Sequence, residues 1–497
     1  MLGVLLKWLL IYKVEIVMSR LLGALLLAVW VGFVAAPAQA QVEWVTPLGL
    51  PDSKSGFVSQ YDCLMPRLGA SSPVLAPRPP ASSPGQSATT PWWGRTQDGD
   101  GRVDARWTKV DALGGAVVSR APVPPSSVIC GAPVTAEGGR MVVEEYGNRR
   151  LSQFDATGVL RWQSGGTSTP QSSFTPAVIS VAANGDSTYV VGNRLRRVNA
   201  SGGVMFDIAT GVTGVKYLAV NASGDTWLVA NDSGTATTVS RFSSSGNQLW
   251  LTTASTACIW ETTAALLTAT DELLFAGFAC NEARVVSIAA DGRLLWQRLM
   301  SGTEPRTRVR LSALTVDGAG NAYVAGCAEA GFLTYSSPNA WTVAASWSAS
   351  GAERWSAAAD VAGGISACSS ALALSANGLL YIATAADITN SSDSPGVSAL
   401  WVLDTAGVEK WRHRSALSSP AATRPDVSIT ADGALIVLGD AAQTSPYLRT
   451  STLRRINVAS IGNTLRLKVM EVPVTAIGYR EAFAVRVGLR DAGDAPA

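Results

Sequence analysis

Short apolar runs alternate with tight polar turns along most of the chain after residue 130. In residues 287–296, apolar residues stand on either side of Asp291-Gly292. Gly and Asp tolerate the positive φ of a tight hairpin turn, so this stretch predicts two antiparallel strands. A second turn of this kind precedes each such hairpin, as at Asn184-Gly185. Each unit of the chain is therefore predicted to contain four strands.

The second hairpin of each unit ends on an aromatic residue. These residues are Trp162, Phe206, Trp250, Trp296, Trp355 and Trp411, and they recur about every 40–60 residues. Four strands at this period predict an all-β fold, a β-propeller of four-stranded antiparallel blades stacked around an axis. A parallel β-helix would repeat at a shorter period, and a β-sandwich needs about 100 residues per domain. We predict seven blades over residues 130–470, with eight as the alternative if residues 41–130 supply a partial blade.

The hairpin motif also carries a family resemblance. Asp155-Ala156-Thr157-Gly158 followed by Trp162 is the closest copy of an Asp…Thr-Gly…Trp pattern. It resembles the repeats of the PQQ-like β-propeller superfamily, in which the Trp docks against the next blade. The resemblance covers roughly residues 130–470 and implies that Trp162, Trp250, Trp296, Trp355 and Trp411 are blade-docking residues. That superfamily includes quinone-dependent dehydrogenases and also cofactor-free scaffolds, such as the outer-membrane-assembly propeller lipoprotein.

The first 40 residues have the pattern of a signal peptide. Met18-Ser19-Arg20 precedes an apolar run over residues 21–36, and Ala38-Gln39-Ala40 follows as a small-residue cleavage pattern. Translation that truly starts at Met18 is an alternative. A membrane helix is the less favoured interpretation, because no basic flank follows the apolar run. We expect an exported protein, periplasmic or secreted, with no transmembrane anchor after cleavage.

The remaining boundaries follow from composition. Residues 41–129 are predicted to be an N-terminal segment that contains a Pro-rich linker at 66–91, with strands at 41–48 and 102–110. Residues 471–497 are predicted to be a C-terminal strand and tail, and the alternation over 471–490 suggests a further outer strand for the last blade.

The charge balance limits the class of partner that we expect. The chain has 39 Lys and Arg against 37 Asp and Glu, and 15% of its residues are charged. A nucleic-acid surface needs clustered excess positive charge, so no nucleic-acid partner is predicted.

All six cysteines follow the leader, and export favours disulfides over buried free thiols. From their places beside the predicted strands, we expect the pairs Cys63–Cys130, Cys258–Cys280 and Cys327–Cys368.

Motifs for catalysis are missing from the sequence. His413 is the only His and is predicted to lie in a solvated loop, no two Cys are adjacent, and there is no H-E-x-x-H or Gly-rich phosphate loop. No catalytic and no cofactor-binding residues are therefore predicted. The one candidate metal site is Asp98, Asp100 and Asp104, whose spacing around Gly residues suits Ca²⁺. A Gly-rich turn with solvated carboxylates is the favoured alternative.

Long connections suggest where a partner binds. Residues 331–340, 386–398 and 441–450 follow the second strands of the last three units and are longer than their counterparts. Binding residues concentrate on loops held by a rigid scaffold, although neutral insertion is equally compatible. The candidates are Phe332, Tyr335, Asp387, Asn390, Asp393 and Tyr447. We predict a non-catalytic exported scaffold that binds a protein or cell-envelope ligand on this face. The alternative is a quinoprotein-like oxidoreductase or another propeller enzyme.

Overall fold

The computed structural model describes strands and turns in two compact units. The larger unit is Val42–Asn457, and the smaller combines Met1–Gln41 with Val458–Ala497. The described residues are 151–155, 159–164, 178–182, 184–191, 193–232, 236–255, 260–279, 282–300, 308–329, 340–359, 366–387 and 396–416, together with separate strands between 41 and 144 and between 426 and 490.

The strands of the larger unit form antiparallel sheets, which we number in chain order. Sheet 1 contains β2 (Phe57–Val58), β3 (Cys63–Leu64), β4 (Thr89–Gln97), β5 (Val103–Asp111) and β6 (Val117–Val123). Sheet 2 contains β7 (Ser127–Val128), β8 (Arg140–Glu144), β9 (Leu151–Phe154) and β10 (Leu160–Ser164). Sheet 3 contains β11 (Val178–Val181), β12 (Ser187–Val191), β13 (Arg194–Val198) and β14 (Val204–Ala209). Sheet 4 contains β15 (Val215–Val220), β16 (Thr226–Asp232), β17 (Ala236–Phe242) and β18 (Gln248–Ser255).

The second half of the unit continues the pattern. Sheet 5 contains β19 (Trp260–Leu267), β20 (Leu273–Ala279), β21 (Glu282–Ile288) and β22 (Leu294–Met300). Sheet 6 contains β23 (Arg308–Val316), β24 (Ala322–Glu329), β25 (Ala340–Trp347) and β26 (Glu353–Ala359). Sheet 7 contains β27 (Ser366–Leu374), β28 (Leu379–Asp387), β29 (Gly396–Asp404) and β30 (Glu409–Ala416). Sheet 8 contains β31 (Asp426–Ile429), β32 (Leu435–Ser445), β33 (Leu448–Asn457) and, as its outer strand, β1 (Gln41–Pro47).

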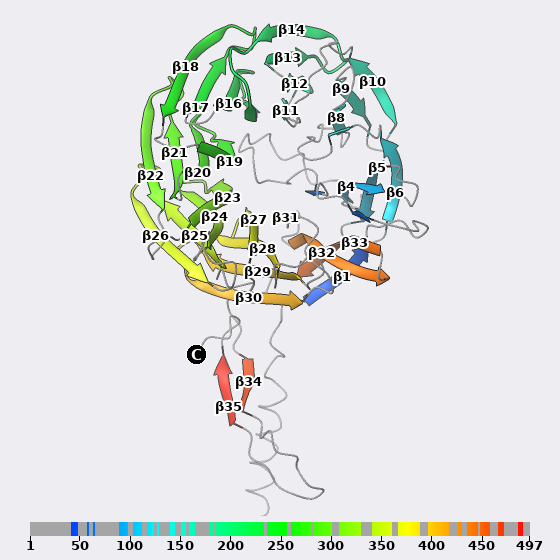
Figure 1. Ribbon diagram of the computed structural model, residues 1–497, viewed down its shortest axis with the longest axis vertical. Coiled ribbons are helices and arrows are strands. Elements are labelled where there is room, and N and C mark those ends of the chain that lie inside the picture. The colour runs from blue at the N-terminus through cyan, green and yellow to red at the C-terminus, as the bar shows by residue number, and fades with distance from the viewer. Residues whose placement is uncertain are drawn as a thin grey trace, which may run out of the picture. The chain divides into compact units, whose positions relative to one another are not determined.

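These sheets are arranged in a ring, and the fold is an all-β propeller (Figure 1). The first strands β11, β19, β23, β27 and β31 lie nearest the axis, and the fourth strands β14, β18, β22, β26 and β30 lie on the outside. In sheet 4, β15 is the edge strand opposite β18, so it is also an inner strand. The hydrophobic core is shared between neighbouring sheets. One cluster, for example, joins Leu274 and Val285 of sheet 5 to Val324 and Val343 of sheet 6. Each sheet therefore buries its faces only by packing against its neighbours.

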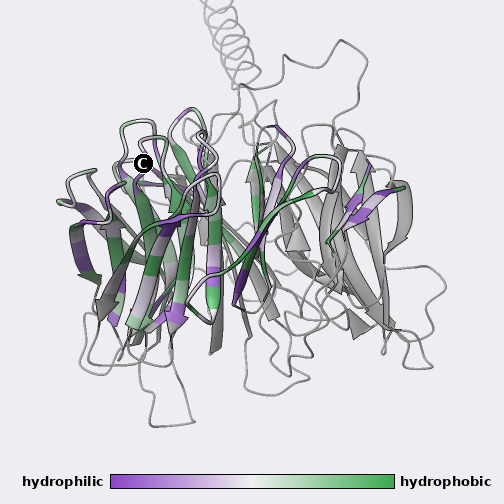
Figure 2. Cartoon of the chain, turned by 90° about the horizontal axis from the view of Figure 1, so that it is seen from above, coloured by the Kyte–Doolittle hydropathy of each residue, from purple (hydrophilic) through white to green (hydrophobic). Residues whose placement is uncertain are grey.

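The tight turns lie together at one end of the strands (Figure 2), which we call the tight-turn face. They join the first strand of a sheet to the second and the third to the fourth. The connections from second to third strand leave from the other end, which we call the long-connection face. Within the described strands, the break between β12 and β13 is residues 192–193, whereas sheets 6 and 7 have breaks at 330–339 and 388–395.

The described strands of the larger unit form eight sheets of four or five strands. Residues 57–123 supply the five strands of one of them, within the range 41–130 that the eight-bladed alternative assigns to a partial blade. The sequence obscures this sheet because it lacks the Gly-aromatic hairpin of the later units. The strands predicted at 41–48 and 102–110 correspond to β1 and β5. No helix long and apolar enough to cross a membrane occurs in the described part of the chain.

Three further expectations are corrected. The outer strand of the last sheet is β1, whereas β34 (Arg466–Glu471) and β35 (Arg486–Arg490) pair only with each other, in the smaller unit. Residues 441–445 and 448–450 continue β32 and β33, because the hairpin stays paired as far as Ser445 and Leu448. His413 lies in β30 opposite Leu400 rather than in a loop.

Candidate functional site

The closing aromatic residues join each outer strand to the following sheet. The indole Nε1 of Trp296 donates a hydrogen bond to the carbonyl oxygen of Ala349, at 3.0 Å. Its ring packs against Gly351, which has a φ of +81°, and a Cβ there would lie 2.6 Å from Trp296 Cγ. The same hydrogen bond joins Trp162 to Ala200, Trp250 to Ala290 and Trp355 to Thr405, each at 2.9 Å.

Two of the closing aromatics differ from this pattern. Phe206 packs on Gly246 but has no N–H to donate. Trp411 is buried, and the described strands of the following sheet form no hairpin at the corresponding place, because its outer strand β1 comes from the other end of the unit. Trp296 is buried as well, whereas Trp162, Trp250 and Trp355 are half-buried. The five closing aromatics other than Trp411 each require a glycine beneath the ring, because any side chain at that position would overlap the ring.

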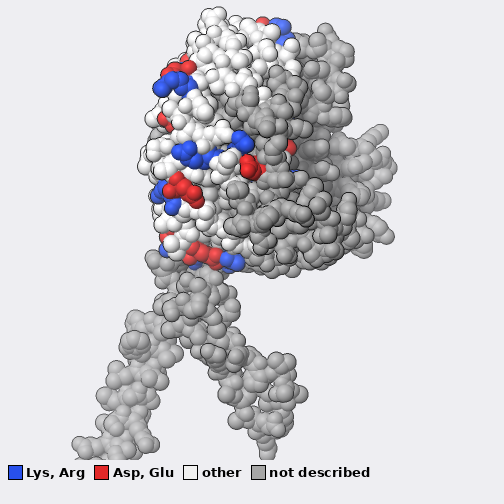
Figure 3. Space-filling view, turned by 60° about the vertical axis from the view of Figure 1, so that its left-hand side comes forward, with Lys and Arg blue, Asp and Glu red and all other residues white. Residues whose placement is uncertain are grey.

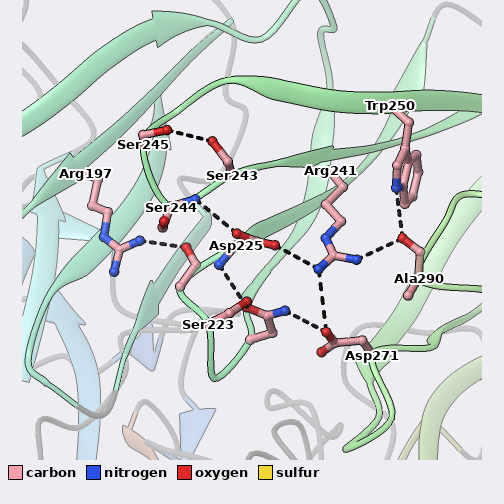
Figure 4. Close-up of polar contacts among 12 residues, drawn as sticks. Arg197, Ser223, Asp225, Arg241, Ser243, Ser244, Ser245, Trp250, Asp271 and Ala290 are labelled. Atoms are coloured by element: carbon pink, nitrogen blue, oxygen red, sulfur yellow. Dashed lines mark hydrogen bonds and ion pairs between the residues drawn. The ribbon is translucent and has the colours of Figure 1, made fainter.

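Arginines of sheets 3 and 4 add polar links on the tight-turn face (Figure 4). Arg197 forms a buried ion pair with Asp186 at 3.1 Å and donates to the carbonyl oxygen of Gly224 in the next sheet, at 2.6 Å. The Arg241 guanidinium pairs with Asp225 at 2.8 Å and with Asp271 of sheet 5 at 3.6 Å. These two side chains therefore hold three successive sheets together.

Asp271 combines an ion pair with an unusual backbone. It occupies the glycine position of its turn with a φ of 60°, the one positive value at a non-glycine among the described residues. Its Oδ2 also accepts a hydrogen bond from Asn221 Nδ2 at 2.8 Å. Asp is among the few residues that tolerate this conformation. The sequence shows that this turn lacks Gly, but it does not show that the Asp271 carboxylate forms an ion pair with Arg241.

A second polar cluster lies on the tight-turn face of sheet 6. Asp317 Oδ2 accepts hydrogen bonds from the Tyr323 hydroxyl and from Asn321 Nδ2, both at 2.8 Å. Arg354 donates to the Tyr323 hydroxyl at 2.7 Å. Burial opposes ionisation of Asp317, but the hydrogen bonds from Asn321 and Tyr323 hold its pKa below the ordinary value. Burial raises the pKa of Tyr323.

The innermost strands carry β-bulges at matching positions in three sheets. The extra residue is Lys216 in β15, Thr263 in β19 and Ser312 in β23. The Thr263 hydroxyl donates to the Leu311 carbonyl oxygen, which joins the bulge of sheet 5 to that of sheet 6. A Cβ on Gly326 would lie 2.0 Å from the Arg310 carbonyl oxygen, so the strand beside the bulge of β23 requires glycine. Bulges re-aim side chains and are frequent beside functional sites.

Several predicted site residues lie outside the described part of the chain. These are Phe332, Tyr335, Asn390, Asp393 and Tyr447 of the long connections, Asp98 and Asp100 of the calcium candidate, and Cys130, Cys258 and Cys280. Asp387 ends β28 opposite Gly396, and Asp104 lies in β5 opposite Thr96. Cys63 lies in β3 and Cys368 in β27. Cys327, in β24, is buried and disulfide-bonded. Among the residues whose side chains are described, no three metal-binding groups converge.

No protein-family model matches the chain, and no curated protein matches it by sequence. Similar solved structures include the quinohemoprotein alcohol dehydrogenase from Comamonas testosteroni, with 9% identity, a TM-score of 0.47 and coverage of 84% of this chain and 76% of that one. The C-terminal WD40 domain of Sif2 has 11% identity, a TM-score of 0.49 and coverage of 74% and 92%. A protein from Lactobacillus plantarum has 10% identity, a TM-score of 0.44 and coverage of 66% and 96%. An enzyme and a WD40 domain both appear, so these similarities do not distinguish between functions.

Proposed function

We propose that this β-propeller is a non-catalytic scaffold that binds a protein or cell-envelope ligand on its long-connection face. The observation that carries the proposal is the contrast between the two faces. On the tight-turn face, polar groups are used within the fold. On the opposite face, connection length changes from sheet to sheet, and the connections at 330–339 and 388–395 are much longer than that at 192–193.

The tight turns show how completely their polar groups are used. In each, the first residue donates its N–H to the carbonyl oxygen four residues on, and the fourth residue donates back to the first. The side-chain oxygen of the first residue usually accepts the N–H of the fifth, as in the turns that begin at Asn199, Asn221, Ser243, Thr268, Asp317, Ser348, Ser375 and Asp404. Such turns leave few polar groups for a partner.

Several charges on the described surface form ion pairs. In Figure 3 the Lys and Arg side chains of the described surface lie in small groups with Asp or Glu. Examples are Arg293 with Asp291 at 2.7 Å and Lys410 with Asp404 at 3.0 Å. On a rigid ring with such a surface, the connections between strands are the segments that remain available to a partner. Binding residues concentrate on such loops of stable scaffolds.

The docking of Trp296 on Gly351 supports membership of the PQQ-like propellers. The lack of two adjacent cysteines in the sequence favours the cofactor-free scaffolds among them. The pattern of residues 1–40 supports export to the periplasm or the medium. On this proposal the partner is neither nucleic acid nor a membrane spanned by the chain.

Replacement of residues 388–395 by Gly-Asn, the 192–193 connection, tests the proposal. Asp387 and Gly396 are paired, so a two-residue link closes the hairpin and the fold should persist. The matched control replaces turn 348–352 with turn 243–247, which changes the opposite face but keeps the turn hydrogen bonds. Thermal unfolding and partner capture from a cell-envelope extract are the measurements. Capture should fall only in the first variant; full capture with an unchanged melt would overturn the proposal.

A further inference from the structure

Charged side chains with no ion-pair partner gather on the innermost strands. Lys216 of β15 and Glu261 of β19 are exposed, and Arg310 of β23 is half-buried. Among the described residues, none of the three has an ion-pair partner, whereas Arg194, Arg196, Arg197 and Arg241 are all paired. The guanidinium of Arg310 lies over the Phe278 ring, 5.0 Å from its centroid, and its Nε is buried with no hydrogen-bond partner.

These residues lie near the start of the first strand in three consecutive sheets. Lys216 is itself the bulged residue of β15, whereas Glu261 and Arg310 stand two positions before the bulges at Thr263 and Ser312. The Thr263–Leu311 hydrogen bond shows that the bulged segments of sheets 5 and 6 touch. We call Lys216, Glu261, Thr263, Arg310 and Ser312 the inner rim.

The inner rim belongs to the long-connection face. The first strands run from that face toward the tight turns at 221–225, 268–272 and 317–321. Lys216 is the second residue of β15, Glu261 the second of β19 and Arg310 the third of β23. All three therefore lie at the end of their strands where the long connections also leave.

The charge pattern favours one chemical class. Two cations flank one carboxylate around the axis. The Thr263 hydroxyl is already hydrogen-bonded to the carbonyl oxygens of Ala276 and Leu311, so the charged groups carry the recognition of a ligand. A guanidinium held against an aromatic ring presents a planar fork of donors, which matches the two oxygens of a carboxylate. Lys216 supplies a second positive charge that is not neutralised within the fold. Glu261 opposes a further negative charge, so it would limit the affinity for an anion.

We propose that the inner rim binds carboxylate groups of an acidic peptide segment carried by the partner. This inference deepens the proposed function and rests on it, because it assigns the partner's chemistry on the same face. Arg310 and Lys216 hold the carboxylates, and Glu261 sets an upper limit on how many are accepted.

Binding of a fluorescent hexaglutamate peptide to the full-length protein, with hexaglutamine and hexalysine as matched peptides, tests the inference. Only hexaglutamate should bind. Lys216→Gln and Arg310→Gln should each weaken it about tenfold, the loss expected for one charge-assisted hydrogen bond. Glu261→Gln should strengthen it, a result that a merely structural role would not produce. The controls are Arg293→Gln and Glu353→Gln, which remove exposed charges elsewhere and should leave binding unchanged.

The outcomes separate this inference from the proposed function. Hexaglutamate binding that is absent, or indifferent to Lys216, Arg310 and Glu261 in variants with an unchanged melt, overturns the inference. The proposed function survives that result if the 388–395 replacement still loses its partner. Conversely, hexaglutamate binding that follows the expected order supports the inner rim even if the 388–395 replacement retains capture, in which case the proposed function fails.

Discussion

The indole Nε1 of Trp296 lies 3.0 Å from the carbonyl oxygen of Ala349, so the outer strand of sheet 5 is hydrogen-bonded to a turn of sheet 6. The acceptor is two residues before Gly351, and the ring rests on that glycine. The Trp296 side chain thus contacts the turn of sheet 6 twice, through the hydrogen bond to Ala349 and through the packing of its ring on Gly351. Repeated at Trp162, Trp250 and Trp355, the contact links neighbouring sheets around the ring.

Trp296→Ala should lower the free energy of unfolding by about 3–5 kcal/mol, the usual cost of truncating a buried Trp. Trp296→Phe should cost about 1 kcal/mol for the lost hydrogen bond, and more if the smaller ring packs poorly. Urea unfolding followed by far-ultraviolet circular dichroism measures both. The exposed neighbour variant Leu295→Ala is the control, with an expected effect below about 0.5 kcal/mol. Equal effects for Trp296→Ala and Leu295→Ala would contradict the docking role.

Two glycines separate backbone strain from steric overlap. Gly351 and Gly378 have similar positive φ values, but a Cβ on Gly351 would lie 2.6 Å from Trp296, whereas on Gly378 it would meet Thr405 at 3.6 Å. Gly378→Ala should therefore cost only the left-handed penalty of about 1–2 kcal/mol. Gly351→Ala should cost clearly more. Chemical denaturation of the two variants side by side checks this, and equal losses would mean that the Trp296 ring moves aside freely.

The Asp271 turn should respond differently to glycine and alanine. Asp271→Gly removes the left-handed strain, about 1 kcal/mol, and loses a hydrogen bond of similar worth, so stability should change little. Asp271→Ala keeps the strain and loses the bond, and should be less stable by about 1–2 kcal/mol. Arg241→Met should lower the free energy of unfolding by about 3 kcal/mol, because it leaves the carboxylates of Asp225 and Asp271 without their ion-pair partner. Melting temperatures in the order Ala above Gly would refute the strain at this position.

Stability should depend on pH through Asp317. Its folded-state pKa lies below the unfolded value of about 3.9, so its contribution is complete above that value and is lost as the pH falls through the folded pKa. Asp317→Asn should therefore be less stable than the unaltered protein at neutral pH, and the gap should narrow as the pH falls below the unfolded value. Urea midpoints at neutral and at acidic pH measure it. Leu295→Ala, which changes an exposed residue and removes no titratable group, is the control and should shift the midpoint equally at neutral and at acidic pH.

Peptide mapping without reduction should identify the partner of Cys327. Cys327 stands near the end of β24 and Cys368 near the start of β27, in neighbouring sheets, and we expect these two to be linked. A Cys258–Cys280 link is expected in the same map. Loss of either bond should cost about 2–4 kcal/mol. A peptide that joins Cys327 to any other cysteine would contradict the pairing.

Local chemistry explains what was readable in the sequence. The turn pattern of a small polar residue followed three positions later by Gly reports hydrogen bonds that close within five residues, as in turn 404–408. The apolar alternation reports strands, and the recurring aromatic reports the repeat. These features predicted the all-β propeller, because each depends on residues close together in the chain.

Tertiary packing decided what the sequence could not show. The strand β1 completes sheet 8 from the opposite end of the unit, a pairing that no local pattern encodes. In the sequence, nothing distinguishes Arg241 from a surface residue. In the folded protein, sheet 5 places the Asp271 carboxylate 3.6 Å from the Arg241 guanidinium. The bulges that place Lys216 and Thr263 depend on how each inner strand meets its neighbours. The pairing of β1, the ion pair of Arg241 and the bulges of the inner strands all depend on residues that are distant in the sequence. The inner rim therefore forms only when the chain is folded.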